Sequence, residues 1–151
     1  QVDVLGRSGQ SSERITYHGK VYHGNFELIN RADILIVNAG FSAVSEAVVL
    51  RKPVIVIPIA NHAEQYFNAI TIQEKGLGLI ATVENIREKL GEMMARFPEF
   101  LEAHNKFNCD TLGAFKSAVA IDNLLAGKDV FSALFESPVG QKRRLDKVEP
   151  V

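Results

Sequence analysis

The sequence predicts an α/β fold of the Rossmann-like, doubly wound type, with helices on both faces of a parallel sheet. Two unbroken apolar runs, 34–37 and 54–57, are typical of strands that are buried on both faces. Each run is followed by a segment with helical spacing, and this alternation is the pattern of parallel strand–helix–strand units. We therefore expect right-handed crossovers and a ligand site at the carboxyl ends of the strands, in loops 19–25, 38–42 and 58–64.

The N-terminal elements are short. Residues 2–5 and 15–18 predict two strands, separated by a glycine- and serine-rich loop at 6–13. Asn25 can cap a helix over 26–31, because its side-chain oxygen can accept a backbone N–H of the first turn.

The central elements carry the strongest pattern. The turn Asn38-Ala39-Gly40 follows the first buried run and leads into a helix expected at 42–50, which Pro53 stops. A helix at 64–75 follows the second buried run, with Gly76 as its C-terminal stop. The remaining elements are a strand at 77–81 and helices at 84–96, 99–108 and 111–126, with breaks at Pro98 and Gly127.

Composition restricts the kind of protein. The chain has 151 residues, 46% of them hydrophobic, which suits one compact domain, expected over 1–135, and a charged tail at 136–151. A net charge of −1 gives no general attraction for nucleic acid. The single cysteine, Cys109, excludes an internal disulfide, and the four histidines lack metal-ligand spacing, so we expect neither a metal nor a cofactor.

We expect a cytoplasmic protein. No apolar run reaches the roughly 18 residues of a membrane span, and no secretory signal opens the chain. The basic tail segment Lys142-Arg143-Arg144 could be attracted to the anionic inner face of a membrane, as a peripheral association.

The turn before residue 42 could bind phosphate. Gly40 allows a ligand close to the backbone, and the first N–H groups of the helix that follows have no internal partner and favour an anion. The alternative is a simple strand-to-helix turn. One helical turn after Ser42, Glu46 lies in an apolar stretch, where ribose hydroxyls could pair with its carboxylate. An exposed charge, or an ion pair with Arg51, is the alternative for Glu46.

The loop after residue 57 is polar and could bind the hydroxyl groups of a sugar. It offers several hydrogen-bonding side chains close together in the sequence. They are His62, Glu64, Gln65 and Asn68. The alternative is structural: Asn61 caps the helix and Glu64, three residues later, completes a capping box.

Residues 32–82 resemble the donor-binding domain of UDP-sugar glycosyltransferases of the GT-B superfamily. The resemblance rests on an ordered set of features: a buried strand, a glycine turn, Ser-Glu-Ala in a helix, Lys-Pro, a second buried strand ending in proline, Glu-Gln and Asn-Ala. The matching sequence is ADILIVNAGFSAVSEAVVLRKPVIVIPIANHAEQYFNAITIQEKGLGLIAT. The group that adds N-acetylglucosamine to lipid-linked muropeptide, with its uncharacterised relatives, is the most similar.

The resemblance implies a role for each matching position. Backbone N–H groups of Gly40, Phe41 and Ser42 would hold the donor diphosphate, and Glu46 would bind the ribose hydroxyls. The segment Asn25-Phe26 would bracket the uracil with its backbone.

The same resemblance places Glu64 and Gln65 on hydroxyls of the transferred sugar, with His62 beside them. Many relatives have threonine where this chain has Ala43, which leaves Ser42 as the hydroxyl for phosphate.

The resemblance also implies missing parts. In this superfamily the acceptor site and the usual catalytic base lie in a separate N-terminal domain, and the donor domain begins with a further strand and a glycine-rich loop. We expect this chain, which begins at Gln1, to be a fragment or one subunit of a split enzyme, inactive alone. Its partners would be a UDP-sugar and an acceptor domain, on the N-terminal region or on another chain.

Three functions follow from the resemblance. The first is donor binding in a hexosyltransferase that moves a hexose or N-acetylhexosamine to an acceptor hydroxyl. The second is a UDP-sugar epimerase or hydrolase of the same fold, and the third a non-catalytic partner subunit that binds nucleotide-sugar. A nicotinamide dehydrogenase domain fits poorly, because its glycine fingerprint is absent.

Overall fold

The computed structural model describes residues 1–20 and 23–131. The chain divides into two compact units, one spanning Gln1–Cys109 and the other beginning at Asp110. The expected tail at 136–151 lies outside the described residues.

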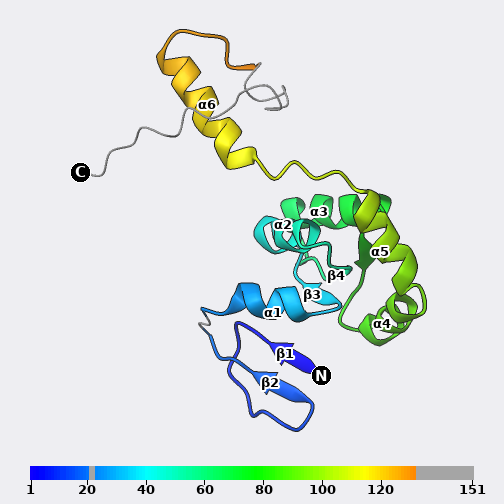
Figure 1. The fold of residues 1–151 in the computed structure, drawn as a ribbon. Helices are drawn as coiled ribbons and strands as arrows, with labels where there is room; N and C mark the ends of the chain where they lie inside the picture. Colours follow the sequence, from blue (N-terminus) through cyan, green and yellow to red (C-terminus); the bar gives the residue numbers. More distant parts are fainter. Residues whose placement is uncertain (21–22, 132–151) are drawn as a thin grey trace. The chain divides into compact units, whose positions relative to one another are not determined.

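Five strands and five helices form the described part of the first unit (Figure 1). The strands are β1 (Val2–Val4), β2 (Ile15–Tyr17), β3 (Leu35–Val37), β4 (Val54–Val56) and β5 (Gly78–Ile80). The helices are α1 (Asn25–Arg31), α2 (Phe41–Val49), α3 (Ala63–Glu74), α4 (Ile86–Ala95) and α5 (Phe97–Lys106). The order of strands and helices expected from the sequence is confirmed, with shifts of one to two residues at most boundaries.

Parallel pairing defines both sheets. One sheet has the order β3-β4-β5, with Leu35 opposite Val54 and Val54 opposite Gly78. The other pairs β1 with β2, also in parallel, across a connection without an intervening helix. The central strand β4 is buried along its whole length, as its unbroken apolar run predicts.

The two faces of the three-stranded sheet pack against different helices. Because side chains alternate along a strand, Val54 and Val56 point to one face and Ile55 to the other. The first face packs with Ala47 of α2 and with residues of α3 in one buried cluster. Ile55 packs with Met93 of α4 and with Phe100 of α5 in a second cluster. A parallel sheet with helices on both faces is the doubly wound arrangement that the sequence predicts (Figure 1).

Two capping predictions are wrong. Asn25 is the first residue of α1, and the cap is Gly24, without a side-chain bond. At α3 the cap is His62 in an extended conformation, again without a side-chain bond. Asn61 cannot act there because it adopts the left-handed conformation with φ of 60°, so it forms the turn that precedes the cap.

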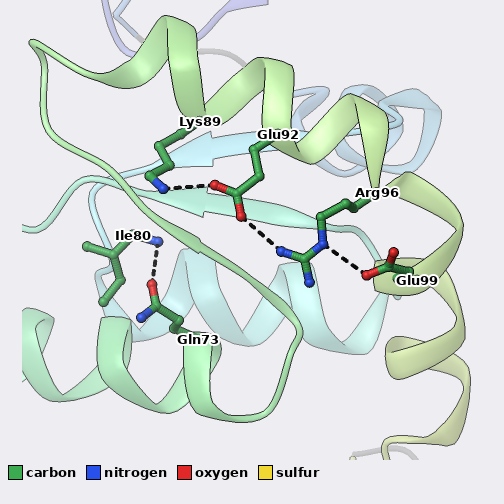
Figure 2. Close-up of polar contacts among 6 residues, drawn as sticks. All are labelled: Gln73, Ile80, Lys89, Glu92, Arg96 and Glu99. Carbon is green, nitrogen blue, oxygen red and sulfur yellow. Dashed lines mark hydrogen bonds and ion pairs between the residues drawn. The ribbon is translucent and has the colours of Figure 1, made fainter.

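An ion-pair chain joins α4 to α5 (Figure 2). Arg96, between the two helices, donates to Glu92 and to Glu99 at 2.9 Å each, and its guanidinium lies 5.2 Å from the Phe100 ring centre. Lys89 also pairs with Glu92, at 2.8 Å, and this bond lowers the pKa of the Glu92 carboxyl. These ion pairs bridge the junction at Arg96, where α5 begins at Phe97 with Pro98 in its first turn.

The second unit contains helix α6 (Gly113–Leu125), close to the expected range. Asp110 stabilises its beginning by accepting from the Leu112 amide at 2.9 Å and pairing with Lys116 at 2.6 Å. Over residues 1–20 and 23–131, none of the helices has the length and apolar character needed to cross a membrane.

His104 is a buried histidine beside Leu77, the residue that precedes β5. Its side chain on α5 is 2% exposed, and Nε2 donates to the Leu77 carbonyl at 2.8 Å, while Nδ1 has no partner among the described residues. Burial lowers the pKa of His104; the bond to Leu77 opposes this effect and the Arg51 charge adds to it. The folded chain therefore holds His104 neutral under conditions where the unfolded chain begins to protonate it.

We predict that this histidine makes the fold less stable in mild acid. The unfolded chain takes up a proton near pH 6.5 and the folded chain only at lower pH, so the free energy of unfolding falls as pH drops below about 6.5. Urea unfolding at about pH 7.5 and about pH 5.5 measures the loss. His104→Gln, which keeps a donor for Leu77 but cannot titrate, should show a smaller loss. An equal loss in both proteins would contradict the assignment.

Candidate functional site

Two loops lie at one edge of the three-stranded sheet. Residues 38–40 follow β3 and residues 57–62 follow β4, and neighbouring parallel strands bring their carboxyl ends to the same edge. Helix α3 begins directly after the second loop and reaches the first through side chains. Of the three loops predicted to form the site, 38–42 and 58–64 therefore lie at the same sheet edge, whereas loop 19–25 follows β2, which belongs to the other sheet.

The loop after β3 has an unusual backbone. Ala39 is fully buried and has φ of 61°, a conformation that residues with a β-carbon rarely adopt. Its carbonyl accepts from Nδ2 of Asn68 at 3.0 Å, and the Gly40 amide donates to Oδ1 of Asn38 at 3.3 Å. Side chains from α3 and from the loop itself thus hold this turn.

The turn presents the beginning of α2. Gly40 is the cap, in extended conformation, and Val44 is the first residue whose amide reaches a carbonyl of the helix, that of Gly40. The amides of Phe41, Ser42 and Ala43 precede it, so none has a helical acceptor. An anion at this end of the helix is favoured by these amides and by the helix dipole.

One of these amides already donates a hydrogen bond to a carboxylate of the chain itself. The Phe41 amide donates to Oε1 of Glu64 at 3.3 Å. Glu64, Ser42 and the Phe41 ring are all exposed to solvent, so this end of α2 is open. The contact is long for a charged pair and lies at the surface, which makes it easy for another anion to replace.

The loop after β4 is held by a buried amide. Gln65 is 6% exposed, and its Oε1 accepts from the Ile59 amide at 2.9 Å. His62 is exposed at the cap position of α3. A surface hollow of about 490 Å³ lies here, lined by residues 58–63 with Tyr66 and Phe67.

The remaining predicted residues lie on α1 and α2. Glu46 is exposed on α2, and Arg51, the ion partner considered for it, bonds Asn105 at 3.1 Å instead. Phe26 is 65% exposed near the start of α1 and borders a hollow of about 380 Å³. Helix α1 is tied to the loop before β4, where Lys52 donates to the Asn30 carbonyl at 2.6 Å.

Hydrogen bonds connect some of the predicted residues. Glu64 is bonded to Phe41, and Asn68 to the residue before Gly40, while Gln65 bonds the second loop. Among the described residues, no side-chain hydrogen bond links Glu46, His62 or Phe26 to this group. In the same part of the chain, no three histidine, cysteine, aspartate or glutamate side chains are placed to share a metal ion.

Sequence reasoning missed the residues that shape the first loop. Asn38 and Ala39 were expected only to turn the chain, yet Asn38 bonds the Gly40 amide and Ala39 takes the strained conformation. An asparagine two residues before a glycine is a known signal for such a local bond. A positive φ at alanine has no comparable signal in the sequence.

Known proteins are similar to this chain over the same region. Residues 4–98 match glycosyl transferase family 1. An uncharacterised glycosyltransferase of Methanopyrus kandleri is 36% identical over 63 residues, which are 42% of this chain and 18% of that protein. A UDP-N-acetylglucosamine–N-acetylmuramyl-(pentapeptide) pyrophosphoryl-undecaprenol N-acetylglucosamine transferase of Deinococcus deserti is 31% identical over 77 residues, 50% of this chain and 20% of that enzyme.

A solved structure supports the fold. The crystal structure of the glycotransferase of kitacinnamycin superposes with a TM-score of 0.53 at 17% identity, covering 83% of this chain and 30% of that one. The chain thus spans about a fifth of the length of the two relatives above and under a third of this structure. Because the family match covers more than half of its residues, the chain belongs to glycosyl transferase family 1, with the GT-B type of fold.

Proposed function

We propose that this chain binds the UDP-sugar donor of a hexosyltransferase. The observation that supports the proposal most directly is the open beginning of α2, where the Phe41–Ala43 amides have no helical acceptor and Glu46 follows one turn later. Two anionic phosphates fit the amides, and a carboxylate one turn away fits the ribose. Family membership makes a sugar nucleotide the natural ligand.

The proposed chemistry is electrostatic. The helix amides and dipole stabilise the diphosphate as it leaves the sugar carbon, without a metal or cofactor. As the diphosphate binds, it replaces Glu64 on the Phe41 amide and frees that carboxylate for hydroxyls of the sugar, beside His62. The Phe26 backbone brackets the uracil.

The rest of the reaction lies elsewhere. The acceptor hydroxyl and its base belong to a second domain, on another part of the protein or on another chain, so this chain alone transfers no sugar. Peripheral attachment to an anionic membrane would bring it to a lipid-linked acceptor.

Nucleotide titration tests the proposal. We predict saturable binding of UDP by calorimetry, with the largest amide NMR shifts at residues 40–45, where the phosphates settle. Uridine, which lacks the phosphates, is the control and should bind at least about tenfold more weakly, because charge-assisted bonds are lost. Absence of saturation with millimolar UDP, or shifts confined to α4 and α5, would refute the donor site.

A further inference from the structure

Asn68 contacts the loop that leads into the donor site rather than pointing into open solvent. Its Nδ2 donates to the Ala39 carbonyl at 3.0 Å, and the side chain is half-buried. Ala69, the next residue, is fully buried in the core between α3 and the sheet, so this part of α3 is fixed. A side chain on a fixed helix can set the position of the loop that it bonds.

The bonded loop residue requires such support. Ala39 has φ of 61°, which crowds its β-carbon, and it is completely buried, so its carbonyl depends on a protein partner. The next three residues, Gly40, Phe41 and Ser42, are those whose amides the proposed function assigns to the diphosphate. Rotation of the Ala39–Gly40 peptide would change the direction of these three amide N–H groups together.

We propose that Asn68 is a positioning residue for the diphosphate-binding amides and does not contact the transferred sugar. This inference rests on the proposed function. The sequence alone groups Asn68 with His62, Glu64 and Gln65 as candidates for binding sugar hydroxyls. The inference gives Asn68 a different role from these neighbours. Asn68 therefore determines the affinity for the diphosphate that every UDP donor shares, whichever sugar it carries.

Two nucleotides distinguish the roles. Asn68→Asp keeps the size of the side chain but replaces the donating amide with an oxygen that repels the Ala39 carbonyl. We expect the affinities for UDP and for UDP-N-acetylglucosamine to fall by the same factor, about tenfold, leaving their ratio unchanged. The amides of residues 39–41 should also shift in the ligand-free variant. The matched control is Gln73→Glu, which makes the same charge change near the other end of α3.

A suppressor excludes general damage to the fold. Glycine accepts positive φ without strain, so Ala39→Gly in the Asn68→Asp background should restore part of the UDP affinity.

Two results would overturn the inference. One is loss of affinity for UDP-N-acetylglucosamine only, which would make Asn68 a sugar contact. The other is unshifted 39–41 amides in the ligand-free variant, with no rescue by Ala39→Gly. If the unmodified chain binds neither nucleotide, the proposed function fails instead, and the ligand-free spectra still decide whether Asn68 sets the loop.

Discussion

Gly78→Ala is expected to destabilise the first unit by about 3 kcal/mol or more, a large part of the stability of an ordinary domain. Gly78 begins β5 and is buried against the central strand. A β-carbon at this position would overlap the Val54 carbonyl oxygen and lie 2.9 Å from Cγ2 of Ile72. The Val54 carbonyl belongs to the backbone of β4, which cannot move without separating the strands that it joins.

A second glycine provides a control with the opposite sign. Gly91 lies within α4, and a β-carbon there meets nothing within 4 Å. Gly91→Ala should therefore stabilise the fold by about 0.5–1 kcal/mol, the usual gain from alanine in a helix interior. Urea unfolding followed by circular dichroism measures both variants. Equal stability of Gly78→Ala and the unmodified chain would show that β4 and β5 pack less closely than in this structure.

The sequence predicts the sheet well because its signals are local. The apolar runs 34–37 and 54–57 are each followed by a turn and a helical pattern, and both became parallel strands. The prediction that both are buried on the two faces is wrong for β3, because β3 lies at the edge of the three-stranded sheet and Ile36 is 50% exposed. Burial of β4 on both faces follows from its unbroken apolar residues. The ends of elements were harder to predict, since Asn25 and Asn61 have the chemistry of caps without the geometry.

The sequence predicts where the site lies in the fold, but it does not predict the side-chain contacts within the site. Its two loops follow from the rule that parallel strands present their carboxyl ends together. The contacts that shape it, Glu64 with Phe41 and Asn68 with Ala39, join residues 23 and 29 positions apart, and no spacing rule covers such pairs. Gln65 illustrates the consequence: its polarity suggests a ligand, yet its oxygen is buried on the Ile59 amide.

Glu46→Ala is expected to lower the affinity for UDP by about tenfold to a hundredfold, the effect of removing hydrogen bonds between a carboxylate and the ribose hydroxyls. Glu46 is exposed on α2, so its removal creates no cavity and the unfolding midpoint should stay unchanged. Calorimetric titration with UDP measures the effect. Glu74→Ala, an exposed position at the last turn of α3, makes the same change in charge and should leave the affinity unaltered.

Removal of the ribose hydroxyl identifies what Glu46 binds. The unmodified chain should bind 2′-deoxy-UDP more weakly than UDP, because one partner of the carboxylate is missing. In Glu46→Ala the two nucleotides should bind almost equally, since a bond that is already lost cannot be lost again. If the preference for UDP survives in Glu46→Ala, the carboxylate acts through its charge or not at all, and ribose recognition must come from another residue at this edge of the sheet.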